Sequence, residues 1–165
     1  MWVVIKYKKN QYNCLVEKFI NIFGKDAEFY KPTLRCEKNS IKKKITDKNL
    51  LGDYVFCFHK KLENFQVINI LKNLRGLKEI IKGHIFYQKE ISNFIKMCKS
   101  YEDIEGFITQ DFFDHLQITK GKFVTGPLTN LIFDVVSRNS KKLKISINNK
   151  TIILDKKTGY IYQPI

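Results

Sequence analysis

The sequence predicts an α+β protein made of two small domains that are joined by an acidic linker. Strand-like and helix-like patterns are mixed over residues 1–100, whereas residues 115–165 contain only short strand-like runs. Between them, residues 101–114 hold five acidic side chains and no lysine or arginine. This change in composition divides a chain of 165 residues, a length that suits two small domains.

A strand and a helix are expected first. Residues 2–7 are rich in β-branched and aromatic side chains, which predicts a buried strand. Asn10 is expected to cap a helix that runs to about Phe23 and stops at Gly24. The helix is predicted because apolar side chains recur every three or four residues, at Tyr12, Leu15, Phe19 and Phe23.

The rest of the first part alternates between extended and helical patterns. Residues 28–36 are expected to be extended, with Pro32 favouring a sheet edge, and the lysine-rich residues 37–48 to form a loop or hairpin tip. The remaining expected elements are strands over 54–59 and 77–81 and helices over 65–72 and 88–100. This order predicts a mainly antiparallel sheet with helices on one face.

After residue 114 the pattern favours a small β-barrel. Expected strands cover residues 123–124, 132–136, 143–147 and 151–154. Asn148 and Asn149 separate the last two, and this pair suits a two-residue hairpin turn with positive φ at both positions.

The charge of the chain favours a polyanionic partner or an acidic protein surface. The formal net charge is +14, and the apolar fraction of 44% is too high for a disordered chain. Residues 1–100 carry a surplus of +12 and residues 115–165 a surplus of +7. The basic balance therefore belongs to both expected domains.

Several classes of protein are not expected. The longest N-terminal apolar run, residues 2–5, is too short for a signal-peptide core, and no run reaches the length of a membrane span. The four cysteines lack a CxxC pair and are expected to be reduced cytosolic thiols, mostly in the core. The three histidines lack ligand spacing and no catalytic motif is present, so we expect no enzyme, cofactor or metal site.

Five segments resemble the NusG family of transcription factors, in the family's order and along nearly the whole chain. Residues 1–4 (Met-Trp-Val-Val) are similar to its opening strand, and residues 29–35 to the aromatic-x-Pro-x segment before its basic hairpin. Residues 50–56 (Leu-Leu-Gly-Asp-Tyr-Val-Phe) resemble the Leu-Phe-Pro-Gly-Tyr-hydrophobic-Phe signature. Residues 68–77 resemble the helix that closes on Arg-Gly-Val, and residues 126–128 the Gly-Pro-Phe of the C-terminal KOW module.

The chain also departs from the family pattern. Gly52 stands at the signature proline, and the diagnostic KOW glycine falls near Phe133. The usual Gly-Asp of that module is replaced or deleted, depending on whether residues 118–119 or 121–122 align there. The resemblance therefore implies a ferredoxin-like N-terminal domain over 1–100, a linker over 101–114 and a divergent SH3-like barrel over 115–165.

The resemblance implies a non-catalytic, cytoplasmic, monomeric bacterial elongation or antitermination factor. Such a factor binds the clamp helices of RNA polymerase, favours the closed, processive enzyme and changes pausing or termination. A dock of this kind needs exposed apolar or aromatic side chains. The candidates are Trp2, Val4, Lys6, Tyr54 and Phe56. Phe56 and Val4 also fit a plain core role.

The resemblance further implies a contact with non-template DNA through the turn after the first strand and through the Arg-Gly region. With the lysine-rich loop, the candidates are Lys8, Lys9, Gln11, Lys42, Lys43, Lys44, Lys72 and Arg75. Lysine neutralises phosphates, and arginine also reads base edges. The competing interpretation is a solvated basic surface.

For the barrel, the resemblance implies the Rho termination factor or a small-subunit ribosomal protein as partner. The candidates, taken as exposed, are Phe123, Leu128, Leu131 and Phe133. Core packing competes for the aromatic ones. Two other functions remain open, a general basic RNA- or DNA-binding protein and an operon-specific antiterminator of the same family.

Overall fold

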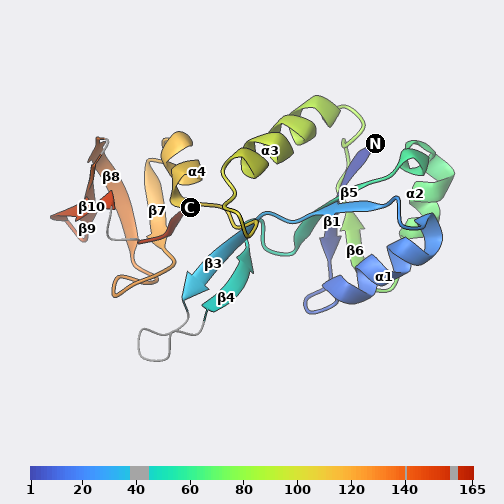
Figure 1. Ribbon diagram of the computed structural model, residues 1–165, viewed down its shortest axis with the longest axis horizontal. Coiled ribbons are helices and arrows are strands. Elements are labelled where there is room, and N and C mark those ends of the chain that lie inside the picture. The colour runs from blue at the N-terminus through green and yellow to red at the C-terminus, as the bar shows by residue number, and fades with distance from the viewer. Residues whose placement is uncertain (38–44, 140, 157–159) are drawn as a thin grey trace. The chain divides into compact units, whose positions relative to one another are not determined.

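The computed structural model describes residues 1–37, 45–139, 141–156 and 160–165. The chain forms two compact units. The first comprises Met1–Thr33 and Asn49–Ser100, and the second comprises Leu34–Lys48 and Tyr101–Ile165 (Figure 1).

The first unit is built on a four-stranded antiparallel sheet with the order β2-β5-β1-β6. Its elements in chain order are β1 (Trp2–Tyr7), α1 (Tyr12–Phe23), β2 (Glu28–Tyr30), β5 (Tyr54–Phe58), the 3-10 helix η1 (Lys60–Glu63), α2 (Phe65–Leu71), β6 (Leu77–Ile80) and α3 (Gln88–Ser100). The expected strands and helices are therefore confirmed, and η1 is an addition.

One face of this sheet packs on α1 and α2. Side chains alternate along β1, so that Val3, Ile5 and Tyr7 all point into the core. The apolar stripe of α1 and the buried side chains of α2 cover them, with Leu15 and Leu71 fully buried. The hydrophobic core of the unit lies in this layer.

The third helix covers the opposite face, which corrects the expectation of helices on one face only (Figure 1). The ring of Phe94 on α3 lies 5.8 Å from that of Phe56, and Phe56 pairs in register with Val4 on the face away from the core. The side-chain amide of Gln88 also holds the backbone of Trp2, accepting from its N–H and donating to its carbonyl. The helix is thus fixed to β1 and β5.

The ends of α1 show one correct and one wrong prediction. Asn10 has a φ of +61° and does not cap the helix; Gln11 occupies the cap position without a capping side-chain hydrogen bond. Gly24 ends the helix as expected, with a φ of +81° and its N–H donating to the carbonyl of Ile20. Glycine suits this end because positive φ is unstrained for it.

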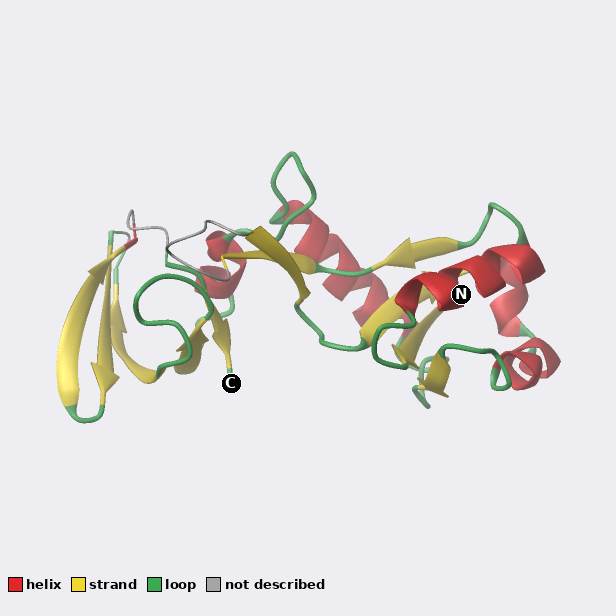
Figure 2. Ribbon diagram, turned by 90° about the horizontal axis from the view of Figure 1, so that it is seen from below, coloured by secondary structure: helices red, strands yellow, loops and turns green. Residues whose placement is uncertain are grey.

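The second unit contains a five-stranded antiparallel sheet with the order β10-β9-β8-β7-β11. Its strands are among the yellow arrows in Figure 2. Its elements are α4 (Gln110–His115), β7 (Lys120–Phe123), β8 (Ile132–Arg138), β9 (Lys142–Ile147), β10 (Lys150–Asp155) and β11 (Tyr162–Pro164). Strands β3 (Thr33–Glu37) and β4 (Ile45–Asn49) form a separate two-stranded sheet. Asn148 and Asn149 have φ of +48° and +64°, which confirms the predicted turn.

This sheet does not close into a barrel in the part of the chain that the structure describes. Its outermost strands, β10 and β11, form no ladder with each other. The expected SH3-like barrel is therefore not confirmed. The unit has instead a sheet that is covered by a short helix.

Residues 101–114, which were expected to be a linker, belong to this second unit. The helix α4 begins at Gln110, and it places Phe112 and Phe113 in the core. Their partners are aromatic, since the rings of Phe113 and Tyr162 lie 6.3 Å apart. The acidic segment is therefore partly structural.

Candidate docking and nucleic-acid interface

All five predicted docking residues lie on the sheet face that looks away from the core. The antiparallel register of β1 and β5 pairs Val4 with Phe56 and Lys6 with Tyr54, next to Trp2. Trp2, Val4, Lys6 and Tyr54 are all half-buried. We call Val4, Lys6 and Tyr54 the open face, because the contacts of α3 described above lie on Trp2 and Phe56.

Phe56, the fifth residue, lies on the same face but is buried under α3. Only 5% of it is exposed, and its ring lies between Tyr30 at 6.2 Å and Phe94 at 5.8 Å. Phe56 is therefore a core residue of the layer between α3 and the sheet. Its effect on a partner would pass through the position of its neighbours.

Lys6 and Tyr54 form a pair at the centre of the open face. The ammonium of Lys6 lies 5.0 Å from the centre of the Tyr54 ring, a cation–π arrangement. The hydrogen bond and charge interaction with Tyr54, followed by Glu79, raise the pKa of Lys6. The pair presents a fixed cation and a phenol, which suits an amphipathic partner that carries both apolar and acidic side chains.

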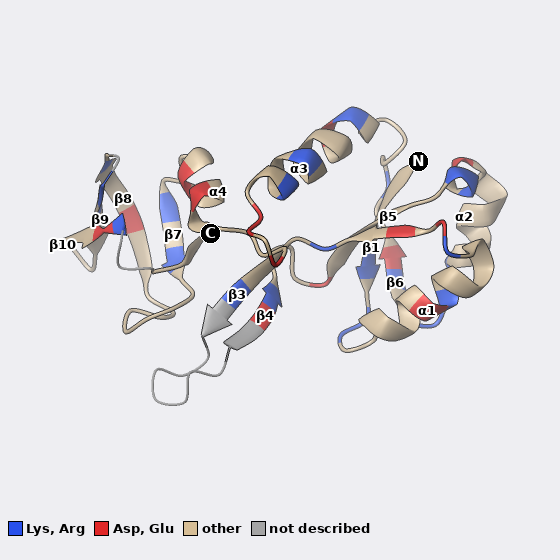
Figure 3. Cartoon of the chain, viewed as in Figure 1, with Lys and Arg blue, Asp and Glu red and all other residues tan. Residues whose placement is uncertain are grey.

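The turn after β1 lies against the Arg-Gly turn before β6. The N–H of Lys8 donates to the carbonyl of Gly76 at 2.8 Å, and the N–H of Gln11 donates to the carbonyl of Lys8. Gly76 has a φ of +91°, and a Cβ there would lie 3.0 Å from the carbonyl oxygen of Gln11. The structure therefore brings Lys8, Gln11 and Arg75 to one end of the sheet. We call Lys8, Lys9, Gln11 and Arg75 the basic turn (Figure 3).

The other predicted nucleic-acid residues are not part of the basic turn. Lys72 donates to Asn69, lies over the ring of Phe65 and lines a separate cavity. Lys42, Lys43 and Lys44 fall outside the described residues. Of the nucleic-acid-binding residues predicted from the sequence, the structure therefore brings only those of the basic turn together.

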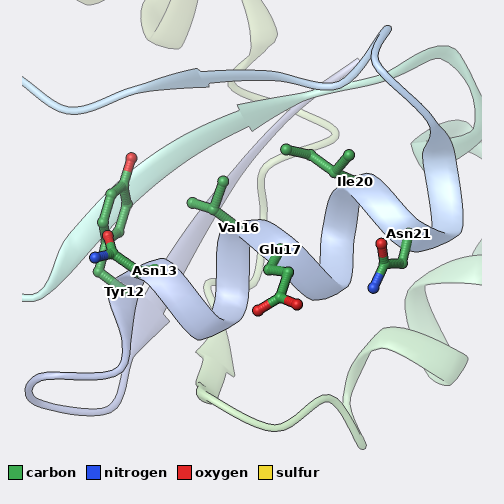
Figure 4. A pocket seen from close by; sticks show the side chains of 6 residues that line it. All are labelled: Tyr12, Asn13, Val16, Glu17, Ile20 and Asn21. Carbon is green, nitrogen blue, oxygen red and sulfur yellow. The ribbon is translucent and has the colours of Figure 1, made fainter.

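A groove on α1 continues from the basic turn and was not predicted. It has a volume of about 290 Å³, and Tyr12, Val16 and Ile20 follow one another along the helix at its wall (Figure 4). The ammonium of Lys31 lies 4.4 Å from the centre of the Tyr12 ring. The signal in the sequence was the Tyr-Lys-Pro segment at residues 30–32, which adds a lysine beside the groove.

Two of the four partner-binding candidates in the second unit are core residues. Phe123 and Phe133 are each 1% exposed, and their rings lie 4.5 Å apart. The expectation that they are exposed is wrong, because both point to the face that α4 covers. Leu131 is exposed and Leu128 is half-buried, so these two remain candidates.

A polar cluster holds α4 to this sheet. The carboxylate of Asp114 accepts from the hydroxyl of Tyr162 at 2.6 Å and from the ammonium of Lys156 at 2.7 Å. The guanidinium of Arg138 donates to the backbone carbonyls of Asp114 and Ile118. Burial first, and then the hydrogen bond to Asp114, raise the pKa of Tyr162.

This raised pKa predicts a loss of stability at alkaline pH. A tyrosine in the unfolded chain ionises near a pKa of about 10. The folded chain keeps Tyr162 neutral above that pH, so its contribution is complete below pH 10 and is lost as the pH rises further. Urea midpoints measured by circular dichroism between pH 8 and pH 11 should fall less steeply for Tyr162→Phe than for the unchanged protein. An equal slope for Tyr162→Phe and the unchanged protein would contradict this role.

No protein-family model and no curated protein matches the chain. Its fold is similar to a crystal structure of the MjSpt4:Spt5 complex, at 12% identity and a TM-score of 0.34 over 100% of this chain and 98% of that one. It is also similar to Thermotoga maritima NusG, at 11% identity and a TM-score of 0.33 over 93% and 92% of the two chains.

The second neighbour is a NusG, the family that the sequence motifs resemble. Among the described residues, no group of three histidines, cysteines or acids could hold a metal ion. In the part of the chain that the structure describes, no helix has the length and apolar character that a membrane span needs.

Proposed function

We propose that this protein is a NusG-like transcription factor that binds RNA polymerase through the open face. The observation that carries the proposal is the register of β1 and β5, which puts Val4, Lys6 and Tyr54 side by side on a surface. Val4 and Tyr54 come from residues 1–4 and 50–56, two segments that resemble the family, and Lys6 lies on the same strand as Val4. Tyrosine is one of the residues that are enriched in binding hot spots.

The proposed target is the pair of clamp helices of the largest polymerase subunits, in the cytoplasm. A helical partner suits this face because apolar side chains spaced along a helix would meet Val4 and Tyr54, while acids would meet Lys6. The basic turn lies at one end of the same sheet, where it would meet phosphates of nearby non-template DNA. Both contacts would then be made by one unit.

The proposed mechanism needs no chemical step. A ligand that binds the closed clamp more tightly than the open clamp raises the population of the closed state by the ratio of its two affinities. A shift from 1:99 to 99:1 needs a difference of about 5.5 kcal/mol. The open face and the basic turn would supply parts of this difference, with consequences for pausing or termination.

Replacing Tyr54 with alanine should weaken binding to purified RNA polymerase at least tenfold. The change removes the ring and leaves Lys6 without its partner, so both parts of the hot spot are lost. Ile22→Ala is the matched control, because this exposed residue lies on α1, on the other side of the sheet. Binding can be measured by surface plasmon resonance with immobilised polymerase, and unchanged binding of Tyr54→Ala would contradict the proposed dock.

A second function, general binding of RNA or DNA, is favoured by the basic turn alone. It predicts that affinity for free nucleic acid falls steeply with salt and depends on Lys8 and Lys9. Polymerase binding through the open face should survive Lys8→Glu with Lys9→Glu. If the double substitution removes binding to free nucleic acid and the unchanged protein does not bind purified polymerase, the second function is the correct one.

For the second unit, the proposed contacts are Leu128 and Leu131. The Rho termination factor and a small-subunit ribosomal protein are the partners that the resemblance implies. Leu131 is the stronger candidate because it is exposed at the start of β8.

A further inference from the structure

The first unit contains a second cavity, away from the open face and the basic turn. Its volume is about 320 Å³, within the range of small binding pockets. It lies between η1, α2 and the segment that connects β6 to α3. Leu62, Ile68 and Ile80 form an apolar, buried floor.

Large apolar side chains are exposed around the mouth of this cavity. Phe65 on one wall is 68% exposed, and Ile85 on the opposite wall is also exposed. The two residues that follow Ile85 extend this surface, since Phe86 is 85% exposed and Tyr87 is exposed as well. Several exposed large apolar residues around one hollow mark a binding site for a protein segment more often than plain surface.

The charges at the cavity are mainly positive. Lys72 and Lys82 both line it and are exposed, while Glu63 is the acid among the lining residues. Among the salt bridges of the described residues, none involves either lysine. Two cations with no carboxylate partner beside an apolar hollow favour an occupant that has both apolar and acidic side chains.

A histidine at the cavity adds an unused hydrogen-bond acceptor. The Nδ1 of His84 lies 2.9 Å from the carbonyl oxygen of Ile81, so Nδ1 carries the proton and Nε2 is left as the acceptor. This Nε2 is buried and is one of two buried side-chain polar atoms without a partner in the described residues. Because Nε2 is buried, a bound segment could donate to it only where the covering side chains move aside.

We propose that this cavity binds an acidic, apolar peptide segment of a partner protein. A bulky apolar side chain would fill the hollow over Ile68 and Ile80, and flanking carboxylates would meet Lys72 and Lys82. Nucleic acid fits less well, because the floor is aliphatic and Glu63 would repel phosphates. The proposal concerns a different surface from the open face, so it does not depend on polymerase binding there.

Fluorescence polarisation on the full chain tests this proposal. The probe is a fluorescein-labelled peptide with leucine and phenylalanine at its centre and two glutamates on each side. Saturable binding is expected, with an affinity at least tenfold weaker for Lys72→Glu with Lys82→Glu. The matched control, Lys18→Glu with Lys25→Glu, has the same change in charge at exposed lysines away from the cavity and should bind within twofold of the unchanged protein.

The shape of the site is tested separately. Ile85→Ala removes an exposed wall residue without touching the core, and it should weaken binding of the same peptide severalfold. A peptide with alanines at its centre should not bind measurably. Equal binding by the two double-lysine variants would overturn the proposal. The proposal would also be overturned if the peptide fails to bind and a ten-residue oligothymidylate, or decanoate, binds instead in a way that depends on Lys72 and Lys82.

Discussion

Replacing Phe56 with alanine should lower the free energy of unfolding of the first unit by about 3–5 kcal/mol, the usual cost of removing a buried phenylalanine. The ring is 5% exposed and lies between Tyr30 and Phe94, so its removal leaves a cavity between the sheet and α3. Urea unfolding followed by tryptophan fluorescence measures this effect. Trp2 is the single tryptophan of the chain, and its ring lies 5.3 Å from Phe58 on the same strand as Phe56.

The matched control is Phe65→Ala, because that phenylalanine is exposed. A surface change of this kind usually alters stability by no more than about 0.5 kcal/mol. If Phe56→Ala costs no more than Phe65→Ala, the account of the layer under α3 is wrong. Tyr54→Ala should resemble the control in stability and differ from it in polymerase binding.

Replacing Phe133 with alanine should destabilise the second unit by a similar amount, about 3–5 kcal/mol. Its ring contacts Phe123 at 4.5 Å and Tyr162 at 5.4 Å, so it joins β8 to both β7 and β11. Hydrogen–deuterium exchange of peptides from residues 120–147 should report the loss. Val136→Ala, at an exposed position on the same strand, is the control and should leave this exchange nearly unchanged.

The glycine opposite Phe133 gives a second test of the same contact. Gly121 pairs with Phe133 in register, and a Cβ at residue 121 would lie 2.7 Å from the tip of the Phe133 ring. Gly121→Ala should therefore cost about 1–3 kcal/mol through overpacking. In a Phe133→Leu background the cost should shrink, because the ring tip is gone. Strictly additive costs would contradict the contact.

Local patterns predicted most elements of the fold. The β-branched and aromatic composition of residues 2–7 predicted the strand β1, which the structure confirms; the alternation of Val3 and Ile5 with Val4 and Lys6 on its two faces is seen in the structure. Asn148 and Asn149 predicted their turn because few other residues accept positive φ at two successive positions. Where neighbouring residues alone favour a strand or a turn, the sequence was sufficient to predict that element.

The helix α4 could not be predicted in this way. Its six residues contain two apolar side chains, Phe112 and Phe113, inside a segment whose charge indicates a linker. What holds it is distant in the chain: Asp114 pairs with Lys156 and Tyr162, 42 and 48 residues later. Short helices depend on such tertiary contacts more than on their own propensity.

The sequence predicted only part of the candidate site, because the rest depends on contacts between residues that are distant in the chain. The pairing of Lys6 with Tyr54 follows from two strands in register, and the contact of Lys8 with Gly76 agrees with the predicted meeting of two turns. The burial of Phe56 depends on where α3 lies, which the Gln88 bond to Trp2 fixes. Lys72 and Arg75 are close in sequence, yet only Arg75 belongs to the basic turn.

The central claim, that the open face contacts the polymerase clamp, is tested most directly by photo-crosslinking. A benzoylphenylalanine placed at Tyr54 in the full chain should crosslink to the clamp helices of the largest polymerase subunit when the complex is irradiated and mapped by mass spectrometry. The same group at Ile20, exposed on α1 on the other side of the sheet, should give no such crosslink. Crosslinks to the clamp from residue 20 and none from residue 54 would contradict the account.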